Sequence, residues 1–191
     1  MARLIDDKTL PNDKFGYRIY GVMAHLPERQ ASEIRKFHKL VGADDLATKP
    51  HCSIDNFWGP DDLDAVKAAI AGVAAKKGPF ETEVDFSDTR IAEWGCAFSL
   101  QPMEGLTTLH DEIVMALNPL TKRIFSLDNP YWPHTTALLS AKPHEIPLIE
   151  PNIGKIDMTG TMRFETIELI GRVGPARGGE YEILESFRLA G

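Results

Sequence analysis

The chain has 191 residues, of which 43% are hydrophobic and 26% are charged, and its formal net charge at pH 7 is −7. This composition is typical of a folded globular protein, and two cysteines are too few for a disulfide scaffold. No run approaches the roughly 20 apolar residues that cross a bilayer, and the N-terminus lacks the apolar core of a secretion signal. We therefore expect a cytoplasmic protein with no membrane partner.

The acidic balance also limits the nucleic-acid partners. A protein that grips a long duplex usually carries a basic stripe that displaces counterions from the phosphates. A net charge of −7 argues against such a stripe. If the substrate is nucleic acid, we expect a small nucleotide or a short RNA end; the oligomeric state is left open.

In the first half of the chain, apolar periodicity and turn residues predict alternating strands and helices. After an irregular arm over 1–15, these are a strand over 17–24, a helix over 28–41 between Pro27 and Gly42, a strand over 50–58, a helix over 61–77, and strands over 80–86 and 94–100.

The second half is richer in strands. It contains a helix over 106–117, a strand over 133–140, a proline-rich connection with Pro143, Pro147 and Pro151, and strands over 161–173 and 181–189 joined by a loop. This order favours an α+β fold over a doubly wound parallel sheet. No linker divides the chain, so residues 16–191 are expected to form a single domain.

Two segments repeat one pattern, Pro-His-x-Ser/Thr-apolar, in Pro50–Ile54 and Pro133–Ala137. Alternate side chains of a strand point to the same face, so His51 and Ser53 project together about 6.6 Å apart along the strand. His134 and Thr136 do the same. In a chain with six histidines, His-x-Ser/Thr with a preceding proline is expected only about 0.04 times by chance, so two copies indicate a function.

These motifs resemble those of the two-histidine (2H) phosphoesterase superfamily, which includes LigT-like 2′-5′ RNA ligases and 2′,3′-cyclic phosphodiesterases. The first strand ending at Leu26-Pro27 and the terminal strand beginning at Tyr181 also resemble the family, so the similarity spans about 16–191. One departure is Ala137, where the family usually has a larger aliphatic residue.

The resemblance implies a bilobal, pseudo-twofold fold in which two antiparallel-rich sheets form a central cleft flanked by helices. It also implies that His51, Ser53, His134 and Thr136 surround one phosphate. The histidines would be the catalytic acid and base, and the hydroxyls would bind the phosphate, with no metal and no cofactor.

The chemistry fits these residue types. Opening a cyclic phosphodiester requires one group to deprotonate water and another to protonate the leaving ribose oxygen, and two imidazoles with pKa values near neutrality can do both. Hydroxyl donors stabilise the charge that grows on the phosphate oxygens. Which histidine is acid and which is base stays open at this level.

Aromatic residues next to the motifs are candidates for stacking a nucleobase, although packing is the more common role for such residues. They are Trp58, Tyr131 and Trp132. The remaining histidines are expected on surfaces or helix faces: His25, His38, His110 and His144.

Several other functions compete with this one. A metal hydrolase would need a further histidine or carboxylate at ligand spacing, and none is evident. Catalysis by Cys52 is disfavoured because strand alternation turns it away from His51. A non-catalytic module that binds a nucleotide or a partner on the same fold, or a 2′-5′ RNA ligase, remains an alternative to a cyclic phosphodiesterase.

Overall fold

The computed structural model describes residues 10–44, 49–123, 130–173 and 180–191. Residues 1–9 of the expected arm and the loop expected at 174–179 lie outside this part of the chain. The elements follow in the order β1 (Ile19–His25), α1 (Glu28–Val41), β2 (His51–Trp58), α2 (Leu63–Ala74), β3 (Phe80–Ala92), β4 (Gly95–Gln101), α3 (Glu104–Leu117), β5 (Lys122–Arg123), β6 (His134–Leu139), α4 (Ile146–Ile153), β7 (Met162–Phe164), β8 (Thr166–Arg172) and β9 (Tyr181–Arg188).

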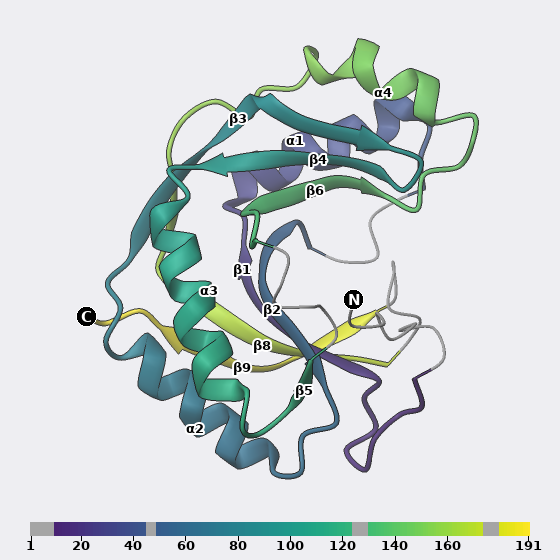
Figure 1. The fold of residues 1–191 in the computed structure, drawn as a ribbon. Coiled ribbons are helices and arrows are strands. Elements are labelled where there is room, and N and C mark those ends of the chain that lie inside the picture. Colours follow the sequence, from purple (N-terminus) through teal and green to yellow (C-terminus); the bar gives the residue numbers. More distant parts are fainter. Residues whose placement is uncertain (1–9, 45–48, 124–129, 174–179) are drawn as a thin grey trace.

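The strands form one strongly curled antiparallel sheet in the order β7-β3-β4-β6-β2-β1-β8-β9, with β5 added to β2. Figure 1 shows the sheet as a C, with β3, β4 and β6 in one half and β1, β2, β8 and β9 in the other. The halves join where β6 lies beside β2. The α+β, two-lobed architecture is therefore confirmed.

Helices cover the outer side of each half. Helix α1 packs on β6 and on α4, and α4 packs on β3; α3 packs on β2 and on α2, and α2 packs on β9. Two helices therefore cross between the halves. Helix α1 follows β1 in sequence but covers the half that contains β6, and α3 follows β4 but covers the half that contains β2. This exchange ties the halves together and leaves the inner side of the C for the strand side chains that face it.

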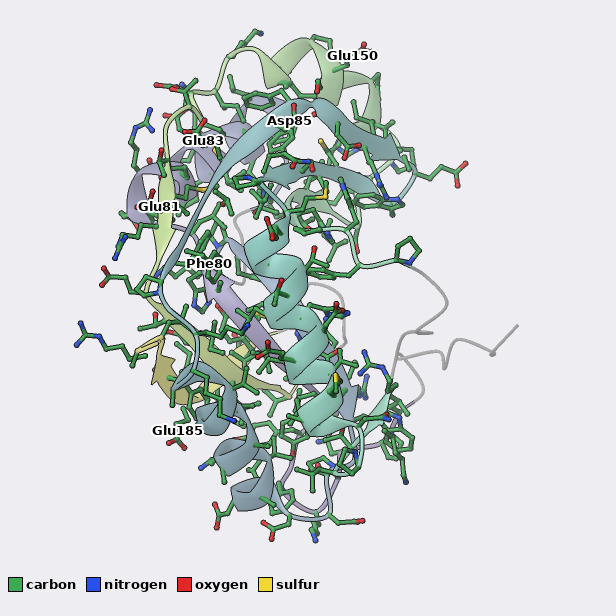
Figure 2. All side chains as sticks on the ribbon, turned by 60° about the vertical axis from the view of Figure 1, so that its left-hand side comes forward. Phe80, Glu81, Glu83, Asp85, Glu150 and Glu185 are labelled. Atoms are coloured by element: carbon green, nitrogen blue, oxygen red, sulfur yellow. The ribbon has the colours of Figure 1, made fainter. Side chains whose placement is uncertain are left out.

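Helix α1 has the predicted ends. Gly42 follows it with φ of 72° and donates its backbone N–H to the carbonyls of His38 and Lys39, which caps the last turn. The strand expected over 80–86 is the first part of β3, where exposure alternates at its start. Glu81 and Glu83 are exposed while Thr82 is buried, and Figure 2 shows the acidic side chains of Glu81, Glu83 and Asp85 following one another along this strand.

The connection expected to be irregular contains a helix, α4, despite its prolines. Pro147 lies in the first turn, where its missing N–H costs no helical hydrogen bond, and Pro151 lies inside the helix. Ile149 and Asn152 are its buried side chains, and the helix packs on α1 and β3. The predicted strand over 161–173 is in fact two strands, because β7 pairs with β3 whereas β8 pairs with β1.

Most of the buried apolar side chains form one core cluster that extends through both halves. Among the described residues, no helix is long and apolar enough to cross a membrane.

Candidate active site

Strands β2 and β6 meet where the two halves join, and their ladder consists of one residue pair, Cys52 with Thr135. Both residues are fully buried, and Cys52 belongs to the core cluster under the helices. Burial also raises the pKa of the Cys52 thiol to about 11, so the reactive thiolate is suppressed. This agrees with the expectation that Cys52 points away from the histidine.

The motif residues on either side of this pair have the opposite orientation. His51 and Ser53 are half-buried in β2, and His134 and Thr136 are half-buried in β6. In an antiparallel ladder centred on this pair, His51 lies beside Thr136 and Ser53 lies beside His134. These four residues therefore form a square on the inner face of the sheet. The two histidines lie at diagonally opposite corners, and the two hydroxyl residues occupy the other two corners.

The two histidine rings are held in the same way. Nδ1 of His51 lies 2.8 Å from the carbonyl oxygen of Lys49, and Nδ1 of His134 lies 2.7 Å from that of Trp132. A carbonyl only accepts, so each ring donates from Nδ1, and its Nε2 is left for chemistry. In both motifs the accepting carbonyl belongs to the residue before the proline.

Burial and like charge set the electrostatics of His51. Burial lowers its pKa to about 4 by penalising the imidazolium, while the bond to Lys49 opposes this. The nearby charge of Arg172, and those of His25 and His134 once protonated, contribute to this lowering. At neutral pH, His51 is therefore an unprotonated base in the free protein.

His134 has aromatic support. The indole of Trp132 lies parallel to its ring at 4.6 Å, and the Arg90 guanidinium lies 3.6 Å from the Trp132 ring centroid. Asp88 accepts a hydrogen bond from Nε1 of Trp132 at 2.8 Å. The pKa of His134 is lowered mainly by burial, opposed by the carbonyl of Trp132 and assisted by the charge of Arg90.

This stack also bears on the base-stacking candidates. The indole of Trp132 stacks on His134 and has the Arg90 guanidinium over its ring, so these protein groups already contact the indole. Tyr131 stacks on His110 at 4.1 Å and donates its hydroxyl proton to the carbonyl of Ser53.

The third candidate, Trp58, lies at the far end of β2. It packs against Leu10 and Ile19, and the ammonium of Lys122 lies 4.6 Å from its ring.

The expectation that the other histidines lie on surfaces or helix faces was wrong for His25, which is in a strand. His25 pairs with His51 across β1 and β2, and only 7% of its side chain is exposed. His38 is on α1 but buried, with its ring nitrogens near the carbonyls of Asp44 and Ala137. His110 faces Tyr131 from α3, whereas His144 is exposed.

Sequence reasoning missed several residues near the histidines because they come from other strands. Arg90 is in β3, and Tyr181 is in β9 with its ring edge-to-face with His51 at 6.4 Å. Ser99 of β4 pairs with His134 and is fully buried. Only the pairing of strands brings these residues to the site. Among the described residues, no three His, Cys, Asp or Glu side chains group so as to hold a metal ion.

No family model and no curated protein matches the sequence. Solved structures do match. TT0787 of Thermus thermophilus is 18% identical with a TM-score of 0.67, over 91% of this chain and 98% of that chain.

E. coli LigT complexed with 3′-AMP is 17% identical with a TM-score of 0.60, over 90% of this chain and 98% of that chain. A protein described as a phosphoesterase is 16% identical with the same TM-score and coverage. At identities this low, the TM-scores show that these proteins share a fold with this chain. The chain therefore has the LigT-like fold, the fold of the superfamily that its two histidine motifs resemble.

Proposed function

We propose that this protein is a metal-independent phosphoesterase of the two-histidine superfamily that opens a 2′,3′-cyclic or 2′-5′ phosphodiester. One observation carries the proposal: the paired motifs place His51, Ser53, His134 and Thr136 on one face at the junction of the two halves. Each imidazole donates from Nδ1 to a carbonyl and keeps Nε2 for the substrate.

Opening of a cyclic phosphate uses the two imidazoles together. One takes a proton from water as its oxygen attacks phosphorus, and the other gives a proton to the ribose oxygen as its bond to phosphorus breaks. The product is a phosphomonoester with a free neighbouring hydroxyl. The hydroxyls of Ser53 and Thr136 donate to the non-bridging phosphate oxygens, where charge grows in the transition state.

The protonation states needed for this step form when the substrate binds. In the free protein the pKa values of His51 and His134 are both lowered by burial, so both rings are neutral at pH 7. A phosphodiester anion between them stabilises an imidazolium, so one ring gains a proton while the other stays neutral. The same anion supplies the counter-charge that a buried imidazolium needs.

A nucleotide or a short RNA end is the proposed substrate. The structures of E. coli LigT contain 3′-AMP, phosphate, NADP+ and ATP, which supports a nucleotide ligand on this fold. In this chain Arg90 lies near His134, and Arg172 lies near His51. These local cations favour a phosphate at the site although the net charge of the protein is −7.

The test is hydrolysis of 2′,3′-cyclic nucleotides in excess EDTA by the wild type and by three variants. We expect full wild-type activity with EDTA. His51→Ala and His134→Ala should each lower kcat about 100- to 10,000-fold, the usual contribution of general acid–base catalysis. The double variant should lose little more, because either substitution already disables the shared step.

His144→Ala is the matched control, since His144 is exposed and also follows a proline; its kcat should equal that of the wild type. Activity lost in EDTA and restored by a divalent cation would contradict the metal-independent mechanism. Independent, multiplicative losses from the two histidines would contradict the paired roles.

A further inference from the structure

A chain of hydrogen-bonding groups leads from a carboxylate on β8 to the ring of His51. Nδ1 of His25 lies 2.5 Å from Oε2 of Glu168, and Nε2 of His25 lies 2.6 Å from the hydroxyl of Tyr181. The backbone of Lys49 lies close enough to this phenol to lower its pKa, against the stronger, raising effect of burial. The carbonyl of Lys49 then accepts Nδ1–H of His51 at 2.8 Å.

Donors and acceptors along this chain agree in direction. A carboxylate only accepts, so a neutral His25 carries its proton on Nδ1, at the 2.5 Å ion-pair contact with Glu168, and its Nε2 accepts the hydroxyl proton of Tyr181. The contact with Glu168 is close but does not have the angles of a hydrogen bond. The Tyr181 oxygen is then available for the N–H of Lys49. Because the carbonyl of Lys49 only accepts, His51 carries its proton on Nδ1. These roles are mutually consistent when His25 is neutral, and burial favours that form by lowering the pKa of His25.

The rings of these residues also surround His51. His25 is its register partner on β1, with the two rings edge-to-face at 6.0 Å, and Tyr181 contacts it edge-to-face at 6.4 Å. His134 has different support, the stack of Trp132 and Arg90. The two histidines therefore share a local motif but differ in the residues that pack against their rings.

We propose that His25, Tyr181 and Glu168 are positioning residues that fix the orientation and the tautomer of His51. Tyr181 holds the backbone of Lys49, whose carbonyl holds Nδ1–H of His51, and His25 and Glu168 hold Tyr181. Nε2 of His51 is thereby kept unprotonated and aimed at the substrate phosphate. This inference rests on the proposed function and adds the groups that prepare one of its two histidines.

The charges around His51 determine which variant tests this idea. His25 faces it from β1, Tyr181 from β9, His134 from β6, and Arg172 from β8. Removing His25 would also remove a repulsion that lowers the pKa of His51. Tyr181→Phe keeps the ring and changes no charge at neutral pH, so it isolates the hydrogen bonds.

The first measurement is the imidazole ¹⁵N spectrum, which reports the tautomer of each histidine without any turnover. In the wild type we expect His51 in the Nδ1–H tautomer. In Tyr181→Phe we expect a mixture of tautomers at His51 and no change at His134. In the kinetic assay kcat should fall about 10-fold while KM stays within about 2-fold, because orientation and not binding is lost.

Tyr17→Phe is the matched control. Tyr17 is another tyrosine with a hydrogen-bonded hydroxyl, which donates to Glu182 at 2.8 Å, but this contact is exposed. Its removal should leave both the ¹⁵N spectrum of His51 and kcat unchanged. A Tyr181→Phe protein with the wild-type tautomer and wild-type kcat would overturn the positioning role.

A second pair of variants decides the question if Tyr181→Phe does not fold. Glu168→Gln keeps an acceptor oxygen for His25, whereas Glu168→Ala removes it. We expect the tautomer of His51 to be preserved in the first and mixed in the second; identical spectra would overturn the proposal. Since the spectra need no substrate, a protein inactive toward cyclic nucleotides would contradict the proposed function alone.

Discussion

Alternation along β2 separates two neighbouring side chains into different roles. Cys52 is buried in the core with its thiol pKa raised to about 11, whereas Ser53 lies on the inner face beside His134. Substituting each of these two adjacent residues therefore compares the buried face of β2 with its inner face. The chemistry proposed for this site uses only the hydroxyl.

Ser53→Ala and Thr136→Ala should each lower kcat about 10- to 1000-fold, because each removes a donor to the phosphate oxygens in the transition state. Cys52→Ala should keep most of the wild-type kcat, at a cost in stability from the small cavity it leaves in the core. Steady-state kinetics with 2′,3′-cyclic nucleotides, with circular dichroism to confirm folding, would measure this. A folded but inactive Cys52→Ala protein would contradict the roles assigned to the two faces of β2.

At the scale of elements, the turn between β3 and β4 depends on one glycine. Gly95 has φ of 137°, and a Cβ placed there would lie 2.0 Å from the backbone oxygen of Leu138 in β6. Gly95 and Leu139 are register partners, so this close approach is part of the pairing that holds β6 in the sheet. The strand that carries His134 and Thr136 therefore needs a residue without a side chain opposite its end.

Gly95→Ala should lower the free energy of unfolding by at least about 2 kcal/mol, since it combines backbone strain with a clash against β6. Gly72→Ala is the control: Gly72 is an exposed position of α2 where a Cβ meets nothing within 4 Å. It should raise the same free energy by about 0.5–1 kcal/mol. Urea unfolding of the two variants would measure both values, and equal effects would contradict the contact with β6.

At the scale of the whole molecule, the buried histidines link stability to pH. The pKa of His51 is lowered by the fold to about 4 from its ordinary value of 6.5. Between these values the unfolded chain binds a proton that the folded protein does not, so stability rises as the pH rises through this window. His25 and His134 have pKa values shifted in the same direction.

The free energy of unfolding should therefore be higher at pH 7 than at pH 5, where most carboxylates are already ionised. In His51→Gln the difference should shrink, by on the order of 1 kcal/mol given that the ring is only partly shielded. Urea unfolding at the two pH values would test this. An unchanged difference in the variant would mean that His51 titrates alike in the folded and unfolded states.

Local features of the chain determined much of this architecture. The ends of α1 follow from Pro27 and Gly42, and the shared face of His51 and Ser53 follows from the two-residue period of a strand. Helix α4 could not be recognised in this way, because its three neighbouring prolines give a loop signal and its stability comes from tertiary packing on α1 and β3, with Ile149 and Asn152 buried.

Tertiary structure decided which strands became neighbours. The sequence by itself determined two Pro-His motifs, each with a histidine and a hydroxyl on one face, because backbone alternation is a local property. It did not determine that β2 lies beside β6, that Arg90 stacks on the Trp132 ring next to His134, or that Glu168 and Tyr181 reach His51 through His25 and Lys49. These contacts join residues far apart in the chain and depend on the curl and strand order of the sheet, which no local pattern encodes.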